Sequence, residues 1–200
     1  MTILVVASRN AGKIAEIRRL LDDVGLEIEL KSVAEFDLPD VEETGDSFEA
    51  NALLKARTIA VATGYPAIAD DSGLAVDALD GAPGIFSARW SGSHGNDRAN
   101  IAKLLDDLRD VPVGNRNGRF IAAISLVLPN GEEITARGEL PGTIRFEAIG
   151  ENGFGYDPIF QPEGEIRTLA QMAPAEKDAI SHRARALRDL APKIGPFIHG

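Results

Sequence analysis

The 200-residue sequence contains no cysteine, only three histidines and only 6% aromatic residues. The absence of cysteine excludes a disulfide framework, a thiolate zinc site and a cysteine nucleophile. Long apolar runs are also lacking, because the longest, Ile121–Leu128, contains Ser125 and is far shorter than the roughly 18 residues of a membrane span. The start, Met1–Ala7, has no cationic residue and a short apolar stretch. We therefore expect no signal peptide, no membrane partner and a cytoplasmic location.

Basic residues are in the minority, with 21 Lys and Arg against 31 Asp and Glu and a net charge of −10. A chain this acidic lacks the general basic surface that binds polymeric nucleic acid. A small polyanion can still be bound where a few cations converge or where a metal ion intervenes.

Apolar spacing and breaker residues predict the secondary structure. The expected elements are a strand over residues 2–7, helices from about 12 and over 47–63, a short strand over 67–69, a helix from about 97, strands over 120–128 and 132–140, and a helix over 174–190. Asp46 and Glu49 resemble a capping box, and Pro192 is expected to end the last helix. Asn130-Gly131 is typical of a tight hairpin turn. We expect an α/β fold with a mixed sheet, as one domain over residues 1–200 with two lobes around a cleft.

A candidate phosphate site follows the first strand, at Ser8-Arg9-Asn10-Ala11-Gly12-Lys13. Backbone N–H groups at a helix start attract anions, and Lys13 adds a full positive charge. The segment differs from a P-loop because Ala7 and Ile14 occupy the positions of the first glycine and the metal-binding hydroxyl. An ordinary strand–helix turn with a solvated lysine is the alternative.

Acidic residues gather in two places. Seven lie between Glu35 and Glu49, and the pair Glu42-Glu43 just before a helix could be an oxygen ligand for Mg²⁺. Asp70-Asp71 closes the short apolar strand, where paired carboxylates indicate a cation partner. A solvated loop and an Asx-type turn are the respective structural alternatives.

Two further segments carry polar and aromatic groups. Gly153-Phe154-Gly155-Tyr156-Asp157-Pro158 could let a flat base stack and form hydrogen bonds, or its aromatics could simply fill the core. The last helix contains Lys177, Ser181, His182 and Arg183. Lys177 and Ser181 share one helix face, and His182 with Arg183 forms a donor cluster suited to a base carbonyl or a phosphate. Solvent-facing side chains are the alternative.

Together these blocks resemble the inosine triphosphate pyrophosphatase family, which acts on deaminated purine nucleotides. The resemblance also includes Glu42–Gly45, Asn51–Arg57, Gly81–Ile85 and Ser87–Arg89, in family order along nearly the whole chain. It implies a two-lobed α/β fold with a long central mixed sheet and the active-site cleft between the lobes. It also implies a homodimer and the reaction of a nucleoside triphosphate with water to give the monophosphate and pyrophosphate, with Mg²⁺.

The resemblance assigns roles to individual residues. Asp71 would be the general base, and Glu43 and Asp71 would hold Mg²⁺, with Glu42 or Asp70 as possible additional ligands. The residues implied to bind the substrate are Ser8, Arg9, Asn10, Ala11, Gly12, Lys13, Lys55, Ser72, Phe154, Gly155, Tyr156, Asp157, Lys177, His182 and Arg183. Phe154 would stack on the base, while Lys177, His182 and Arg183 would donate to the oxygen that replaces the amino group of adenine.

Three other functions remain as alternatives. A degenerate P-loop kinase or NTPase would release the γ-phosphate, and a binding module would hold the nucleotide without turnover. A pyrophosphatase of the septum-inhibitor type would share the reaction but prefer other bases, and the block Ser181-His182-Arg183 argues against it.

Overall fold

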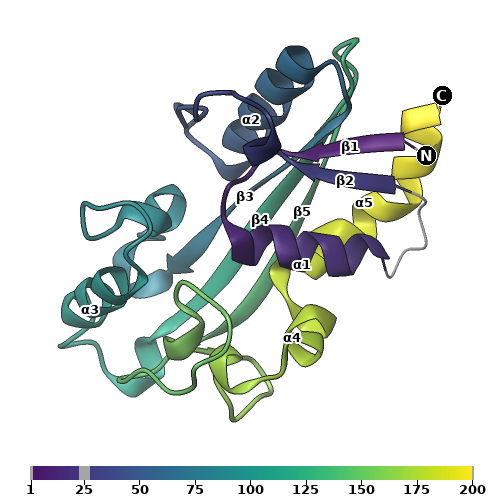
Figure 1. The fold of residues 1–200 in the computed structure, drawn as a ribbon. Helices are drawn as coiled ribbons and strands as arrows, with labels where there is room; N and C mark the ends of the chain where they lie inside the picture. The colour runs from purple at the N-terminus through teal and green to yellow at the C-terminus, as the bar shows by residue number, and fades with distance from the viewer. Residues whose placement is uncertain (1, 23–27, 200) are drawn as a thin grey trace. The chain divides into compact units, whose positions relative to one another are not determined.

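The computed structural model describes residues 2–22 and 28–199 and contains one mixed sheet with helices. The strands and helices are β1 (Thr2–Val6), α1 (Ala11–Asp22), β2 (Ile28–Ser32), α2 (Phe48–Thr63), β3 (Ala67–Val76), α3 (Asp97–Asp107), β4 (Asn117–Val127), β5 (Glu133–Ile144), β6 (Phe160–Pro162), α4 (Pro174–Ile180) and α5 (His182–His199) (Figure 1). None of the helices among the described residues is long and apolar enough to cross a bilayer.

The six strands lie in the order β2-β1-β3-β4-β5-β6. β1 pairs in parallel with both β2 and β3, whereas β5 and β6 pair antiparallel. The predicted hairpin is confirmed: the Leu128 N–H donates to the Glu132 carbonyl, and Gly131 has the positive φ of 93° that the turn requires. The predicted α/β class with a mixed sheet is therefore correct.

The described residues separate into two compact units. The first comprises the residues up to Asp71, Ala122–Gly138 and the residues from Arg183 onward, and the second comprises Ser72–Ile121 and Glu139–His182. The cleft expected between two lobes stays a prediction.

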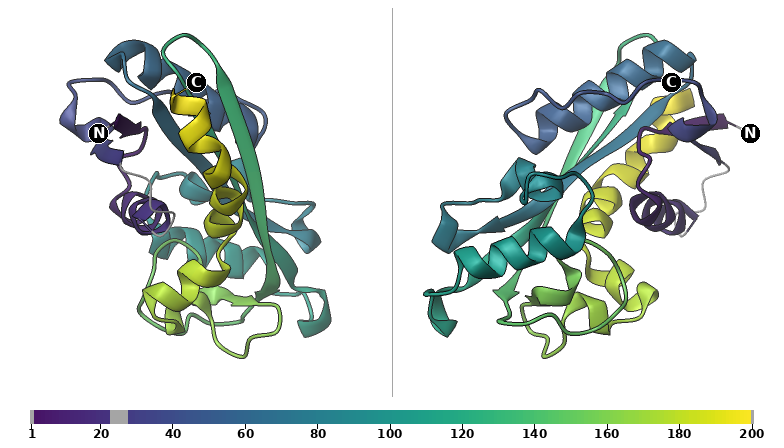
Figure 2. Two further views of the ribbon diagram at one scale, coloured as in Figure 1. Left: turned by 90° about the vertical axis from the view of Figure 1, so that its right-hand side faces the viewer. Right: turned by 60° about the vertical axis from the view of Figure 1, so that its left-hand side comes forward.

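The first unit has a core on each face of β1 and β3. Successive residues of a strand point to opposite faces, so Ile68 packs with α1 and α5 while its neighbour Ala69 packs with α2. Figure 2 shows α2 on one side of β3 and α5 on the other. This alternation continues into Asp70 and Asp71, and it decides which partners each carboxylate meets.

The second unit has its own core around two aromatic rings. Phe120 and Phe160 meet edge to face with ring centroids 4.7 Å apart. Leu104 of α3, Tyr156 and Leu169 are buried in the same cluster. The loop between β5 and β6, which carries Phe154 and Asp157, contributes Tyr156 and Ile159 to this core.

Three sequence predictions about element ends are wrong. β3 does not stop before Asp70-Asp71 but runs on to Val76, because cationic partners from α1 and α2 compensate for both carboxylates. Ser47, rather than Asp46, caps α2 by accepting a hydrogen bond from the Ala50 N–H.

The last predicted helix is two helices with different boundaries from those expected. Ser181 has an extended ψ of 155° and separates α4 from α5. α5 continues through Pro192 and Pro196 to His199. Burial of Leu190 and Ile194 in the core of the first unit stabilises the continued helix despite the hydrogen bonds that the prolines remove.

Candidate active site

The predicted phosphate loop lies between β1 and α1 in the first unit. The Ser8 hydroxyl accepts a hydrogen bond from the Asn10 N–H at 3.2 Å, and the Asn10 side chain accepts one from the Lys13 N–H at 3.1 Å. Asn10 thus caps α1, and Ala11 and Gly12 form its first turn. The N–H groups of that turn point out of the helix, which gives the loop the geometry of an anion site.

Arg9 faces a different segment. Its Nε donates to Asp40 Oδ1 and its Nη2 to the Leu38 carbonyl, each at 2.6 Å. The guanidinium thus holds the chain that leads to Glu43. The predicted contact between Arg9 and substrate stays a prediction.

Lys55 joins two carboxylates in the first unit. Its Nζ lies 2.9 Å from Glu43 Oε1 and 2.9 Å from Asp71 Oδ1, and it also donates to the Asp70 carbonyl at 3.0 Å. Asn51, one turn earlier on α2, donates to Asp71 Oδ2 at 3.3 Å. The structure therefore brings together the two predicted metal ligands around one ammonium group.

Asn51 also fixes the loop that carries Glu43. Its Oδ1 accepts a hydrogen bond from the Gly45 N–H at 2.8 Å. A Cβ on Gly45 would lie 2.7 Å from that oxygen, so the close approach requires glycine.

Asp70 belongs to a second charged group on the opposite side of β3. Its Oδ2 lies 2.7 Å from Lys13 Nζ and its Oδ1 3.2 Å from Arg183 Nε. Arg183 Nη1 lies 3.0 Å from Glu16 Oε2. Glu16, Asp70 and Arg183 are all buried, so the charges face each other in a medium that screens them poorly.

The two adjacent aspartates titrate in opposite directions. Burial alone would raise the pKa of Asp70, but Arg183, Lys13 and Lys55 outweigh it and hold that pKa far below the ordinary range. Burial raises the pKa of Asp71, and Glu43 adds to the increase, although Lys55 and Lys13 partly offset it. Asp70 is therefore a fixed anion, while Asp71 binds a proton more readily than an ordinary aspartate.

Lys55 stays protonated between its acids. Burial lowers its pKa, but Asp71 and Glu43 outweigh that effect, so the net pKa is raised. The position thus holds a permanent positive charge at neutral pH.

The donor set fits Mg²⁺ only as a partial coordination shell. Among the described residues, no group of three or more His, Cys, Asp or Glu side chains is placed to hold a metal ion alone. Glu43 and Asp71 provide carboxylate oxygens on either side of Lys55. This agrees with the usual manner of Mg²⁺ binding, through one or two carboxylates together with water and substrate phosphates.

The predicted base-binding residues meet in the second unit. Asp157 Oδ2 lies 2.5 Å from Lys177 Nζ of α4, and both side chains are buried. The same ammonium lies 4.5 Å from the centre of the Phe154 ring. An aromatic ring, a buried acid and a buried ammonium thus lie together, which suits a flat ligand with polar edges.

Glycine is required for the turn that places Phe154. The Phe154 N–H donates to Asp157 Oδ2 at 3.0 Å, and Gly153 has a φ of 76°. A Cβ on Gly153 would lie within 2.0 Å of the same carboxylate oxygen. Gly155 follows with a φ of 60°, and its N–H donates to Asp97 Oδ2.

Three other predicted residues lie in the second unit. The Tyr156 hydroxyl donates to the Ser87 carbonyl at 2.8 Å, and burial raises the pKa of that phenol. His182 is buried and stacked on Phe120 with an interplanar angle of 13°. Ser72 is the residue of β3 next to Asp71 and is half-buried.

Asn51 and Glu16 have no role predicted from the sequence. The position of Asn51 four residues before Lys55 on one helix face was a usable signal. Glu16 gave no such signal, because an acid in the middle of an amphipathic helix is normally solvent-exposed.

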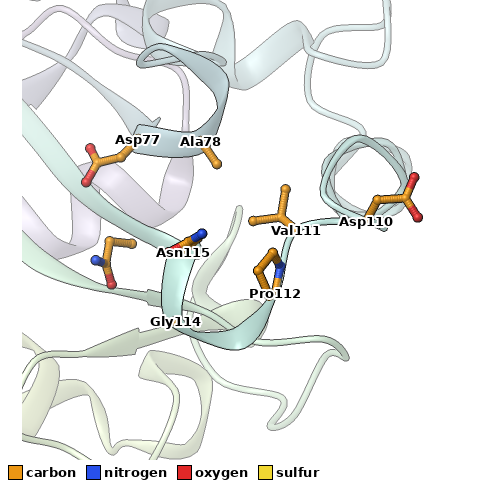
Figure 3. Close-up of a pocket in the computed structure, with 8 residues that line it drawn as sticks. Asp77, Ala78, Asp110, Val111, Pro112, Gly114 and Asn115 are labelled. Carbon is orange, nitrogen blue, oxygen red and sulfur yellow. The ribbon is translucent and has the colours of Figure 1, made fainter.

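The second unit also has an open hollow of about 490 Å³ beside α3 (Figure 3). Ala78, Val111 and Pro112 line it, and the labelled carboxylates of Asp77 and Asp110 point away from the space between them. It contains none of the predicted site residues, so it does not contribute to the candidate active site.

Comparisons with known proteins identify the family of this chain. A family model described as the Ham1 family matches residues 4–193. Two relatives called dITP/XTP pyrophosphatase, from Nocardia farcinica and Streptomyces avermitilis, are 57% and 55% identical to this chain. Each alignment covers 97% of this chain, with 95% of the first relative and 98% of the second.

Solved structures of the same kind of protein match the fold. A HAM1 protein from Coxiella burnetii superposes with a TM-score of 0.88 at 43% identity, over 98% of this chain and 100% of that one. A dITP/XTP pyrophosphatase from Mycobacterium abscessus gives a TM-score of 0.77 at 51% identity, over 96% and 100% of the two chains. The resemblance found in the sequence is confirmed.

Proposed function

Because this chain belongs to the Ham1 family, we propose that it is a nucleoside triphosphate pyrophosphohydrolase acting on deaminated purine nucleotides. ITP, dITP and XTP would be cleaved to the monophosphate and pyrophosphate, which keeps them out of DNA and RNA. The names of the relatives support this substrate class.

One structural observation carries the proposal. Asp71 lies beside Glu43 and Lys55 and follows Asp70, which holds Lys13 at the start of α1. Carboxylates that could hold a metal or act as a base therefore lie in the first unit in contact with ammonium groups that could bind phosphates. A protein that only bound a nucleotide would have little use for a buried carboxylate with a raised pKa.

Asp71 would take the proton from a water that attacks the α-phosphorus. Its raised pKa makes its ionised form a stronger base than an ordinary aspartate. Asn51 and Lys55 hold its two oxygens and so orient it. Lys13, Lys55 and the N–H groups at the start of α1 would bind the phosphates.

Glu43 and Asp71 would hold Mg²⁺. When bound, the ion would offset the negative charge of the triphosphate and of the leaving pyrophosphate. Glu42 lies next to Glu43 in sequence and stays an additional candidate ligand.

The second unit would select the base. Phe154 would stack on it, Asp157 would accept a ring N–H, and Lys177 and His182 would donate to the oxygen at the position where adenine has an amino group. Adenine would place donor against donor, which leaves buried polar groups unpaired and disfavours ATP. Arg183 lies in the first unit, where its Nε and Nη1 face Asp70 and Glu16, and its predicted contact with the base stays a prediction.

The homodimer and the cytoplasmic location are part of the proposal and rest on the family resemblance. The γ-phosphatase and the binding module remain as alternatives that product analysis would separate. The names of the relatives favour purine substrates over those of the septum-inhibitor type.

The test is a phosphate-release assay on ITP and ATP, run with Mg²⁺ and with EDTA. We expect phosphate from ITP only when inorganic pyrophosphatase is added and only with Mg²⁺, with little from ATP. Phosphate without the coupling enzyme would indicate γ-cleavage, and the absence of any release would favour the binding module.

A further inference from the structure

Helix α2 carries Asn51 and Lys55, which orient Asp71 in the proposed reaction. Both side chains lie on one side of the helix, where they contact that carboxylate. At about 100° per residue, Glu49 and Arg57 lie on the opposite side of the same helix. The contacts of that opposite side therefore bear on how α2 presents Asn51 and Lys55 to Asp71.

Two ion pairs join the opposite side of α2 to strand β5. Arg57 Nε and Nη2 donate to the two carboxylate oxygens of Glu133, each at 2.6 Å. Arg137 Nη1 donates to Glu49 Oε1 at 2.7 Å. The first pair is bidentate, so it fixes the mutual orientation of two planar groups as well as their distance. All four residues belong to the first unit.

The spacing of the two pairs matches on both elements. Glu49 and Arg57 are separated by two turns and a fraction of α2, which is about 12 Å at 1.5 Å per residue. Glu133 and Arg137 point to the same face of β5 and are separated by about 13 Å at 3.3 Å per residue. The helix and the strand can therefore form both pairs at once without bending.

The order of the charges permits one alignment of α2 on β5. The acid precedes the base on both elements, and the pairs run antiparallel, with Glu49 at Arg137 and Arg57 at Glu133. A parallel alignment would place acid against acid and base against base, which is unfavourable. Burial would raise the pKa of Glu49, but the hydrogen bond from Arg137 outweighs it, and the hydrogen bond from Arg57 lowers the pKa of Glu133. Both acids are therefore charged at neutral pH.

We propose that Arg57 and Arg137 are positioning residues for the reaction, which fix the rotation and the axial position of α2 through Glu133 and Glu49. Partly exposed ion pairs contribute little to stability, so their effect here is on geometry. Displacement of a reactive group by about 1 Å can lower a rate about 100-fold. The inference rests on the proposed function, because it acts through the orientation of Asp71.

The test exchanges the charges of the pair formed by Arg57 and Glu133. Arg57→Glu and Glu133→Arg each place like charges together, and the double variant restores an ion pair of reversed polarity. This pair is chosen because Glu49 lies in the first turn of α2, where the helix dipole favours an acid and a swap would add a second effect. The matched control is Lys193→Glu, the same reversal in the exposed pair with Asp189 within α5, in the same unit.

Three readouts separate positioning from folding. The side-chain amide resonances of Asn51 report its contact with Asp71 whether or not the protein turns over. Values of kcat and KM for ITP and ATP report the reaction. The midpoint of urea unfolding reports stability, and it should change little in any of these variants.

Each single reversal should shift the Asn51 resonances and lower kcat for ITP about 10-fold, with a smaller change in KM, because the orientation of Asp71 matters mainly in the transition state. The double variant should return both readouts close to wild type. The preference for ITP over ATP should stay unchanged, because Phe154 and Asp157 lie in the second unit. Lys193→Glu should match wild type. Should Arg57→Glu fail to fold, Arg57→Gln removes the attraction without adding repulsion and should show the same changes in smaller measure.

Wild-type kcat in both single reversals would overturn the inference, as would unmoved Asn51 resonances. A double variant as impaired as the single ones would also overturn it, because exchanged charges restore the alignment of α2 on β5. Failure of the proposed function would look different. The wild-type protein would then not cleave ITP, whereas the Asn51 resonances would still shift in the single variants and return in the double one.

Discussion

Asp70 and Asp71 are neighbours on β3, yet their carboxyl groups have pKa values displaced in opposite directions. Strand alternation places Asp70 with Lys13 and Arg183, and Asp71 with Lys55 and Glu43. Two cations serve Asp70, whereas Asp71 shares one cation with another acid. Asp70 is therefore held as a fixed anion, whereas Asp71 binds a proton more readily, as the proposed general base requires.

Replacing Asp71 separates activity from stability. Because folding raises the pKa of Asp71, ionising this carboxyl costs more free energy in the folded protein than in the unfolded chain. We expect Asp71→Asn to lower kcat by about 10²–10⁴-fold, the usual contribution of a general base. Its free energy of unfolding at pH 7, measured in urea, should not fall. Near-normal turnover by a folded Asp71→Asn protein would contradict the assignment.

Replacing Asp70 should instead lower the stability of the folded protein. Asp70→Asn removes the acid between Lys13 and Arg183 and leaves two buried cations with less compensation. We expect the free energy of unfolding to fall by about 3–5 kcal/mol, as when one partner of a buried ion pair is removed. Urea unfolding at pH 7 measures this, and a change below that for Asp71→Asn would be inconsistent with the account.

The stabilisation by Asp70 should depend on pH. The pKa of Asp70 is lowered on folding, so its stabilisation is present above the ordinary aspartate pKa of about 3.9 and is lost as the pH falls below it. The difference in unfolding free energy between wild type and Asp70→Asn should therefore be constant near neutral pH and shrink below about pH 4. A difference that keeps its full neutral-pH value at pH 2 would argue against an ionised Asp70 as its source.

Lys55 acts as an internal cation between Glu43 and Asp71. We expect Lys55→Gln to lose turnover and to bind Mg²⁺ without nucleotide about 10-fold more tightly, a change of about 1.4 kcal/mol. The exposed pair of Lys103 with Asp107 supplies the control Lys103→Gln, which should match wild type. Calorimetric titration with Mg²⁺ alone measures the affinity. An unchanged affinity in Lys55→Gln would argue that Glu43 and Asp71 do not bind the metal.

Base selection should depend on the buried contact of Asp157 with Lys177. Asp157→Asn removes the charge that holds the ammonium beside Phe154. We expect the ratio of kcat/KM for ITP to that for ATP to fall by at least about 10-fold, within the range that unpaired buried groups produce. Asp110→Asn, at the open hollow, is the control. A preserved ratio in Asp157→Asn would place base recognition elsewhere.

The sequence predicted most of the elements but few of their ends. The repeat of Ile14, Ile17 and Leu20 predicted α1, and Asn130-Gly131 predicted the hairpin, because both signals are local. The length of β3 could not be read in this way. Two adjacent acids normally end a strand, and here the partners that allow it to continue come from α1, α2 and α5.

In the candidate site too, contacts between distant segments were the part that the sequence did not predict. Lys55, Glu43 and Asp71 were grouped by family resemblance, and the structure brings them within hydrogen-bonding distance. The burial of Glu16 could not be predicted from the sequence, because Arg183, with which it pairs, lies 167 residues away in the chain. Arg9 is a similar case, since its contact with Asp40 depends on the path of a loop. Contacts between distant segments carry no periodic signal.

The most direct test of the central claim is hydrolysis of ITP by the wild-type protein in water enriched in ¹⁸O, with mass spectrometry of both products. If Asp71 activates a water for attack on the α-phosphorus, one ¹⁸O atom will appear in IMP and none in pyrophosphate. Label in pyrophosphate would mean attack on the β-phosphorus, and label in released orthophosphate would mean attack on the γ-phosphorus. Either of these results would contradict the account.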